Sequence, residues 1–430
     1  MRIAFVVLGF PELSQTFILN QITGLIDRGH AVDIYALNGS EVQTSKAHPD
    51  VQKYQLLDRT YYYRAPDIPA NYVGRLFKGL GMLSAKLYKT PKVWLRSLNV
   101  WRYRRNAASL RHLYKVVPLL GTPTKYDIVH CQFGVCGLQT LFLRQFGLLQ
   151  GKLVVSFRGF DISEMIQLHG DRFYNSLFKN GDFFLTNCDY FRDRIIKLGC
   201  APEKVMVHRS GLDSKKFTFN PPTLAPQERI RIVTSGRLVE KKGIEYSIRA
   251  VAKLAKRYPI EYKIIGDGVL RQQLQQLITE LDATDTVQLL GWKDQPEIIA
   301  VLQASHIFIA PSVTAKNGDQ DAPVNVLKEA MAIGLPVIST YHGGIPELIE
   351  DGVSGFLVPE RDPDAIALKI CHLIDHPQSW LQIASAARAQ VEQNYDLYQL
   401  NDQLVDVYTQ LLANGSVRRT AQNLSAPVAL

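Results

Sequence analysis

Basic residues follow the first apolar run in the second half of the chain. Gly236, Arg237 and Lys242 come directly after the run 230–234, in the sequence Ser-Gly-Arg-Leu-Val-Glu-Lys-Lys-Gly. An arginine and a lysine at a helix entrance can bind a diphosphate, because both cations and the free backbone N–H groups attract phosphate oxygens. The glycine would let a ligand approach the backbone closely. A solvated cationic loop would contain the same residue types, so this motif alone leaves both interpretations open.

Carboxylates with a helical spacing appear in the segment 318–334, which reads Gly-Asp-Gln-Asp-Ala-Pro-Val-Asn-Val-Leu-Lys-Glu-Ala-Met-Ala-Ile-Gly. Pro323 favours the first turn of a helix. The apolar face of that helix would consist of Val324, Leu327, Ala330 and Met331. Asp321 precedes the helix and Glu329 lies eight residues later. A carboxylate on a buried helix needs a partner, and sugar hydroxyls can donate hydrogen bonds to it, whereas periodicity equally permits Glu329 to face solvent.

Two glycine-rich turns accompany these charged residues. Gly266 and Gly268 follow the apolar run 262–265, where a turn without side chains would let a planar base lie against the backbone. The third glycine of a dinucleotide fingerprint is missing, so an ordinary tight turn is an equally good interpretation. Gly343 and Gly344 precede a predicted helix start, and their free N–H groups could face an anion, although a plain turn would have the same residues.

The elements that position these residues follow from short apolar runs that alternate with amphipathic stretches, which indicates βαβ units and parallel sheets. Strands are expected at 3–8, 32–37, 127–131, 153–157, 183–186 and 205–208, and a helix at 17–27. After a proline-rich stretch, strands are expected at 230–234, 262–265, 287–290, 307–310, 337–340 and 356–358. The predicted fold class is α/β, with two doubly wound parallel sheets. Such folds bind ligands in the cleft at the carboxyl ends of their strands.

This organisation predicts an N-terminal domain at 1–216, a linker at 217–229 and a C-terminal domain at 230–376. Residues 377–413 are expected to form terminal helices that pack back toward the N-terminal domain, and 414–430 a flexible tail. The opening run is too short for a signal peptide, and no apolar stretch reaches the ~18 residues of a membrane span. The five cysteines lack C-x-x-C spacing, which argues against zinc ribbons and redox dithiols. A cytoplasmic protein is expected.

The net charge of +9 comes from one segment. Residues 69–125 contain twelve lysines and arginines and no Asp or Glu, which leaves the rest of the chain slightly acidic. Aromatic residues are interleaved with them, including Trp94 and Trp101, and such rings favour a membrane interface. We expect the segment 69–126 to associate with an anionic membrane surface, peripherally on the inner face of the plasma membrane. The alternative is a surface helix with a solvated basic face; a nucleic-acid partner is not expected.

In their order, these motifs resemble those of glycosyltransferase family 4. The segments that carry the resemblance are SGRLVEKKG, IIGDG, LLGW, IFIAPS, DAPVNVLKEAMAIGLPVIST and HGGIPELIEDGVSGFLVP, preceded by YDIVHCQFG, VVSFRGFDIS and LTNCDYFRDRIIKLGCAPEKVMVHRSGLDSKKF. The opening FPELSQTFILNQITGLIDRGHAVDI is similar to the subgroup that makes exopolysaccharides of the colanic-acid type. The resemblance implies a GT-B fold, in which two Rossmann-like domains face each other across a cleft, and a retaining transfer of a hexose-type sugar from a nucleotide-diphospho-sugar.

The resemblance also implies roles for the matching residues. Arg237 and Lys242 would hold the diphosphate, Glu329 would bind the ribose hydroxyls, and Asp321 would face the transferred sugar. Further donor contacts are expected at Gly236, Gly266, Gly268, Ala322, Pro323, Val324, Gly343 and Gly344. Acceptor contacts are expected at Pro11, Ser14, Gln15, Thr16, Arg158 and Asp161, and catalytic roles also at Arg158 and His130. The donor would be a UDP- or GDP-sugar and the acceptor a saccharide or lipid-linked saccharide. No metal or other cofactor is expected, because arginine and lysine bind the phosphates.

Three departures from the family pattern bear on function. Asp321 replaces a glutamate, Arg158 replaces the histidine of an H-G-x-D motif, and His130-Cys-Gln-Phe lacks the second histidine of H-x-H-F. Arg158 cannot serve as a base but could contact a phosphate or an acidic acceptor. These departures motivate an alternative, a catalytically weak paralogue that binds a sugar nucleotide or an anionic lipid without transfer. A nicotinamide oxidoreductase would need a complete glycine fingerprint, which neither half supplies.

Overall fold

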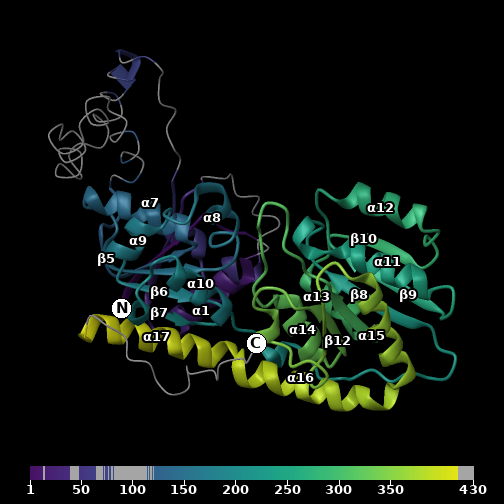
Figure 1. Ribbon diagram of the computed structural model, residues 1–430. Helices are drawn as coiled ribbons and strands as arrows, with labels where there is room; N and C mark the ends of the chain where they lie inside the picture. Colours follow the sequence, from purple (N-terminus) through teal and green to yellow (C-terminus); the bar gives the residue numbers. More distant parts are fainter. Residues whose placement is uncertain are drawn as a thin grey trace.

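The computed structural model describes residues 1–12, 15–38, 48–63 and 121–414, together with 71, 73–75, 77, 78, 81, 114, 116 and 119. Within these residues the chain forms two α/β domains (Figure 1). The sheet of the first domain has the strand order β3-β2-β1-β4-β5-β6-β7, and that of the second has the order β10-β9-β8-β11-β12-β13. All pairings between neighbouring strands are parallel. The architecture of two doubly wound parallel sheets is therefore confirmed.

The first sheet contains all the strands expected from its apolar runs and one more. Its members are β1 (Arg2–Val7), β2 (Ala31–Ala36), β3 (Thr60–Tyr62), β4 (Lys125–Gln132), β5 (Gln150–Phe157), β6 (Phe183–Thr186) and β7 (Val205–Val207). The central strands are almost entirely buried because helices cover both faces of the sheet. The unexpected strand β3 is a three-residue edge strand whose side chains are half-buried, so it lacks the apolar run that marks the others.

The helices of the first domain follow the strands in alternation. They are α1 (Thr16–Asp27), α2 (Pro49–Lys53), α7 (Gly134–Gln145), α8 (Glu164–His169), α9 (Asn175–Asn180) and α10 (Asp189–Lys197). Helix α1 buries Ile18, Ile22 and Leu25 against the sheet. Its N-terminus lies at the carboxyl edge of the sheet because α1 follows β1, and this edge faces the second domain.

The second domain repeats the alternation. Its strands are β8 (Ile230–Ser235), β9 (Ile260–Ile265), β10 (Val287–Gly291), β11 (Ile307–Ala310), β12 (Val337–Thr340) and β13 (Phe356–Val358). Its helices are α11 (Ile244–Leu254), α12 (Arg271–Glu280), α13 (Gln295–Gln303), α14 (Asn325–Ile333) and α15 (Pro363–Asp375). Every strand expected here from the sequence is present.

Two terminal helices, α16 (Trp380–Asn394) and α17 (Leu397–Asn414), run along one side of both domains (Figure 1). Trp380 of α16 packs in the core of the second domain, whereas Leu404 and Tyr408 of α17 pack in the core of the first. The chain crosses between the domains at two places, which lie side by side: the backbone N–H of Leu212 donates to the carbonyl of Tyr395 at 2.7 Å. Of the terminal stretch, α17 thus packs on the first domain and α16 on the second.

Expectations from the sequence concern two segments that lie largely or wholly outside the described residues. They are the basic segment 69–126, up to about residue 120, and the tail from residue 415 onward. Among the described positions of the basic segment, Val73 and Phe77 are exposed. None of the helices in the described part of the chain combines the length and the apolar character that crossing a membrane requires.

Candidate functional site

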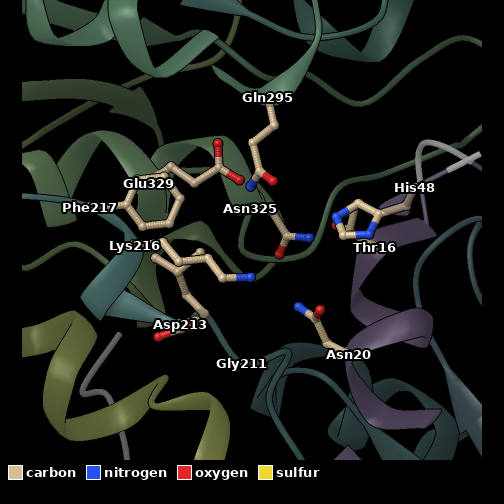
Figure 2. Close-up of a pocket in the computed structure, with 11 residues that line it drawn as sticks. Thr16, Asn20, His48, Gly211, Asp213, Lys216, Phe217, Gln295, Asn325 and Glu329 are labelled. Carbon is tan, nitrogen blue, oxygen red and sulfur yellow. The ribbon is translucent and has the colours of Figure 1, made fainter. Parts of the chain in front are cut away.

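A cavity lies between the two domains (Figure 2). The first domain contributes residues of α1 and the residue before α2, the second contributes α13 and α14, and the connecting segment 211–217 forms the remaining wall. The lining residues are Thr16, Asn20, His48, Gly211, Leu212, Asp213, Lys216, Phe217, Gln295, Asn325 and Glu329. This is the interdomain cleft expected from the fold, since α1 and α14 each follow a strand at its carboxyl end.

Glu329 lies on α14 among the side chains that line this cavity (Figure 2). The apolar face expected for this helix is buried at Leu327, Ala330 and Met331, which leaves Glu329 half-buried on the cavity side. In the described part of the chain its carboxylate has no hydrogen bond or ion pair. Burial raises the pKa of Glu329 to about 7, against the opposing effect of the neighbouring Lys328 ammonium. Such a carboxylate is positioned to accept hydrogen bonds from hydroxyl groups.

Asp321 binds two lysines directly. Lys242 Nζ lies 2.7 Å from Asp321 Oδ2, and Lys241 Nζ lies 3.3 Å from Asp321 Oδ1. The ammonium of Lys241 also contacts Asp319 Oδ2 at 2.9 Å, and Ser312 Oγ donates to Asp321 Oδ2 at 3.0 Å. Burial alone would raise the pKa of Asp321, but the two ammonium groups hold it well below its usual range. The structure thus brings the expected residues Asp321 and Lys242 together and adds Lys241, which the sequence analysis did not single out.

His342 and Glu360 hold the backbone at Asp321. The N–H of Asp321 donates to His342 Nε2 at 2.9 Å, so the proton of the neutral ring is on Nδ1, which donates to Glu360 Oε1 at 2.5 Å. Glu360 Oε2 also accepts the N–H of Thr314 at 2.8 Å. Neither residue was expected from the sequence. The available signal was the position of His342 directly before the pair Gly343–Gly344.

Arg237 is the exposed cation of this group. It follows β8, and its charge acts to lower the pKa values of Lys241 and Lys242, so the three cations are close to one another. Within the described residues Arg237 has no ion pair. Three cations next to Asp319 and Asp321 leave the site net positive, which suits a diphosphate.

The expected donor-binding glycines differ in their surroundings. A Cβ on Gly236 would meet nothing closer than 3.7 Å, so packing does not require glycine there. A Cβ on Gly266 would lie 1.9 Å from the carbonyl oxygen of Gly236, and one on Gly268 would lie 2.5 Å from that of Leu238. Gly343, at φ +51°, likewise faces the carbonyl oxygen of Asp321 at 2.1 Å. Internal packing therefore accounts for these three glycines, whereas the open side of Gly236 lies beside Lys242.

The loop that carries Asp321 also contacts the first domain. Gln320 Oε1 accepts from Arg194 Nη1 at 2.6 Å and from Tyr190 Oη at 3.2 Å, both on α10. The backbone N–H of Gln320 donates to Ser163 Oγ at 3.2 Å. Of its neighbours in the sequence, Ala322 packs against the first hydrophobic core, Pro323 is buried and Val324 is half-buried.

Glu347 makes a second contact between the two domains. Its two carboxylate oxygens accept the backbone N–H groups of Asp189 and Tyr190 at the N-terminus of α10, each at 2.8 Å. Nearby, a Cβ on Gly344 would lie 2.7 Å from Cys188 Sγ, so glycine permits the close approach of the two domains here. Burial raises the pKa of Glu347 to about 7. The domains are therefore joined on the side of the cleft that holds Asp321.

Arg158 directly follows β5, and only 8% of it is exposed. It donates to Gln132 Oε1 from Nε at 3.1 Å and from Nη2 at 2.8 Å. Nη2 also donates to Gln21 Oε1 at 3.1 Å, and Nη1 donates to Ser210 Oγ at 3.1 Å. The guanidinium carbon lies 4.9 Å from the centre of the Phe17 ring. All four neighbours are neutral, and burial lowers the pKa of Arg158 to about 10.

His130 lies in the interior of the first domain, and its expected role in catalysis stays a prediction. His130 is fully buried, and its ring nitrogens lie 2.6 Å from Tyr408 Oη on α17 and 2.7 Å from Ser156 Oγ. Burial lowers its pKa well below the ordinary range, so the ring is neutral. In this position His130 connects the C-terminal helix α17 to the first sheet.

Asp161 is likewise an interior residue, and its expected contact with the acceptor stays a prediction. Its carboxylate accepts the backbone N–H groups of Gly134 at 2.8 Å and of Arg158 and Gly159 at 3.0 Å each. Asp161 therefore shapes the turn from which Arg158 extends. Of the other residues expected at the acceptor, Thr16 lines the cavity, Pro11 and Gln15 are half-buried, and Ser14 lies outside the described residues.

Two family models divide this chain between them. Residues 14–216 match the model described as Glycosyltransferase Family 4, and residues 215–390 match Glycosyl transferases group 1. The solved structure of Anabaena Alr3699/HepE in complex with UDP and glucose shares the fold with a TM-score of 0.67 at 18% identity, covering 96% of this chain and 100% of that one. With its two facing domains, the chain is a GT-B protein and belongs to the family 4 glycosyltransferases.

Two relatives match nearly the whole chain. The putative colanic acid biosynthesis glycosyltransferase WcaL of Salmonella typhimurium is 35% identical over 411 residues, covering 95% of this chain and 99% of the relative. The amylovoran biosynthesis glycosyltransferase AmsK of Erwinia amylovora is 35% identical over 414 residues, covering 96% and 100%. The resemblance to the colanic-acid subgroup is thereby confirmed.

Proposed function

We propose that this glycosyltransferase moves a hexose-type sugar, with retention of configuration, from a UDP- or GDP-sugar to a saccharide or lipid-linked saccharide during exopolysaccharide assembly. Two features of the second domain carry the proposal: the cation cluster at Asp321 and the carboxylate of Glu329, which lines the interdomain cavity. The names of WcaL and AmsK support the exopolysaccharide context. The complexes of HepE with UDP and with UDP-glucose support a nucleotide-sugar donor.

In the proposed mechanism, breaking the anomeric C–O bond places negative charge on the departing nucleoside diphosphate. Arg237 and Lys242 stabilise this charge, and electrostatic stabilisation of developing charge contributes strongly to enzymatic rate enhancement. Lys242 is paired with Asp321 before the donor binds, so its ammonium is already positioned and is shared with the diphosphate afterwards. These cations supply the positive charge that a metal ion would otherwise provide, so we propose transfer without a metal.

Glu329 binds the ribose of the donor in this proposal. Its half-buried carboxylate faces the cavity, its oxygens accept no hydrogen bond from any described residue, and two ribose hydroxyls are suitable donors. Asp321 faces the transferred sugar in this proposal, and it is held by Lys241, by Lys242 and by the contact of its N–H with His342. The acceptor enters from the first-domain side, past Thr16 on α1.

Nucleotide release tests the proposal. The purified chain is incubated with UDP-, GDP- and ADP-sugars in the presence of membrane extract, and free nucleotide is measured. We expect release with one donor, and its loss in Arg237→Gln and Glu329→Gln. Nucleotide binding without release by the unaltered protein would support instead the alternative of a paralogue that binds without transfer. Adding a chelator tests metal independence, and we expect no change in the rate.

A further inference from the structure

We propose that Arg158, with Ser210, binds an oxyanion carried by the acceptor, either the carboxylate of an acidic sugar or a phosphate attached to the saccharide. This inference rests on the proposed function, because it assigns a chemical class to the substrate of the same cleft.

The first observation is the buried guanidinium of Arg158, which has no ionic partner in the part of the chain that the structure describes. Its four described hydrogen bonds all go to neutral oxygens, on Gln21, Gln132 and Ser210. Asp161 interacts with it electrostatically but uses its oxygens on backbone N–H groups. Within the described residues, Arg158 takes part in no salt bridge. A buried cation is costly unless it is paired, so a site of this kind favours an anion that arrives with a ligand.

The second observation is another buried basic side chain, which contacts the backbone of Ser210. Lys328 is 1% exposed, and its Nζ donates to the carbonyl oxygen of Ser210 at 2.6 Å. The hydroxyl of the same serine accepts from Arg158 Nη1 at 3.1 Å. Ser210 thus links a cation of the first domain to a cation of the second, and the positive charge of Arg158 contributes to lowering the pKa of Lys328. Two cations on one half-buried serine concentrate positive potential at the junction of the domains.

The third observation is the position of Ser210 and Arg158 relative to the interdomain cavity. Ser210 precedes Gly211, which lines the interdomain cavity, and the helix α1 that supplies Phe17 and Gln21 to Arg158 also supplies Thr16 to that cavity. The Nη1 atom that points toward Ser210 retains one N–H without an acceptor among the described residues. Neither Arg158 nor Ser210 is among the residues that line the cavity, so the proposed oxyanion would approach the guanidinium from the wall at Gly211, alongside the hydroxyl of Ser210.

The arrangement of Arg158 and its neighbours fits the acceptor rather than the donor. The cations expected to hold the donor diphosphate, Arg237 and Lys242, belong to the second domain, whereas Arg158 and its neutral neighbours Gln21 and Gln132 belong to the first. A guanidinium matches both planar carboxylates and phosphates through paired N–H donors, and lysine cannot reproduce this geometry.

Matched charged and neutral ligands test the inference. With the full-length protein saturated by the nucleotide that binds it, binding is measured by calorimetry for methyl glucuronide against methyl glucoside, and for glucose 1-phosphate against glucose. The bound nucleotide covers the diphosphate site, so the second pair reports on a separate anion site. We expect at least about tenfold tighter binding of one charged ligand than of its neutral match, because hydrogen bonds to charged groups are strong. A preference for methyl glucuronide identifies a carboxylate as the oxyanion, and a preference for glucose 1-phosphate identifies a phosphate.

Variants locate the preference. In Arg158→Gln we expect the charged-to-neutral ratio to fall close to one, and in Arg158→Lys to an intermediate value, with nucleotide affinity unchanged in both. The matched control is Arg192→Gln, since Arg192 on α10 is paired with Asp189 and Asp193 outside the cavity lining. This control should keep the preference of the unaltered protein.

The inference is overturned if the unaltered protein binds charged and neutral ligands equally, or if Arg158→Gln keeps the full preference. The first of these comparisons needs no variant, so it decides the question even if Arg158→Gln does not fold. If no nucleotide binds, the proposed function fails instead, and the same ligand pairs measured without nucleotide still decide whether an anion site exists.

Discussion

Lys242 Nζ lies 2.7 Å from Asp321 Oδ2, so the lysine expected to bind the donor diphosphate is paired with a carboxylate in the free protein. The second lysine, Lys241, contacts the same carboxylate, and the backbone of Asp321 is held by His342. An aspartate that neutralises two cations keeps them in place until phosphate arrives, because an uncompensated pair of buried ammonium groups would repel each other. This relationship makes Asp321 the residue on which both the stability and the charge of the site depend.

Replacing Asp321 by asparagine should therefore impair both properties. Asp321→Asn leaves two buried ammonium groups without their shared partner, and we expect a loss of about 3 kcal/mol in the free energy of unfolding, measured with urea. In the unaltered protein, the low folded-state pKa of Asp321 means that its contribution is complete above the unfolded-state pKa of about 3.9 and is lost as the pH falls below it. In Asp321→Asn, this decrease of the unfolding free energy at low pH should be missing. If the unfolding free energy of both proteins falls equally at low pH, the ion-pair interpretation is contradicted.

The raised pKa of Glu329 predicts how pH affects nucleotide binding. Because its folded-state pKa of about 7 exceeds the unfolded value of about 4.3, its contribution to stability is present at pH 4 and is lost as the pH rises through 7. The Tm advantage of Glu329→Gln over the unaltered protein should therefore be larger at pH 8 than at pH 5. The affinity for nucleotide should change in the direction opposite to the stability of the unaltered protein: it should rise from pH 6 to 8, and only when Glu329 is present. At pH 8, Glu329→Gln should bind nucleotide about tenfold more weakly than the unaltered protein. A flat pH profile in the unaltered protein would show that Glu329 does not contact the nucleotide.

The contact between His130 and Tyr408 predicts a purely structural effect. Tyr408→Phe removes a buried hydrogen bond between α17 and β4, and we expect about 1 kcal/mol less stability with unchanged turnover of the folded enzyme. The measurements are chemical denaturation and nucleotide release at a temperature well below Tm. A loss of turnover at unchanged stability would support the catalytic role expected for His130.

The contact of Glu347 with α10 predicts that the two domains stabilise each other. Glu347→Ala leaves the N–H groups of Asp189 and Tyr190 without their acceptor, and we expect a loss of about 1–2 kcal/mol in unfolding experiments. Glu347→Gln keeps one carbonyl oxygen and should lose less. If the alanine variant is no less stable than the glutamine variant, the carboxylate does not stabilise the interface.

The basic segment predicts binding to anionic membranes, and this prediction rests on sequence alone. We expect the protein to co-sediment with vesicles that contain anionic lipid at low salt, and to be released as the salt concentration rises, because each Lys or Arg near the surface contributes about 1 kcal/mol. Replacing four of the basic residues between 86 and 96 by glutamine should weaken this binding. The absence of binding to anionic vesicles at low salt would count decisively against a peripheral membrane association.

Much of the fold could be predicted because it depends on local patterns. Fully buried parallel strands need continuous apolar runs, and such runs marked every strand except β3, whose three half-buried residues carry no such pattern. The helix carrying Glu329 was equally visible, since Leu327, Ala330 and Met331 recur at helical spacing. The family resemblance also assigned Arg237, Lys242, Asp321 and Glu329 to one site.

Contacts between distant residues could not be predicted in the same way. His130 and Asp161 carry side chains that can act on substrates, and only the tertiary structure showed that both are fully buried with partners in the interior. Lys241, His342, Glu360 and Lys328 belong to the site through partners far away in the sequence, and no spacing rule connects them.

The sequence by itself determined the alternation of strands and helices, the two-domain division and the residue types available for binding a nucleotide-sugar, because periodicity and composition are local properties. Only the tertiary structure decided which of these charges neutralise each other and which have no ionic partner among the described residues. The cause is physical: the free energy of a buried charge depends on its neighbours in space. Those neighbours are two lysines for Asp321, and for Arg158 two amides, one hydroxyl and one aromatic ring.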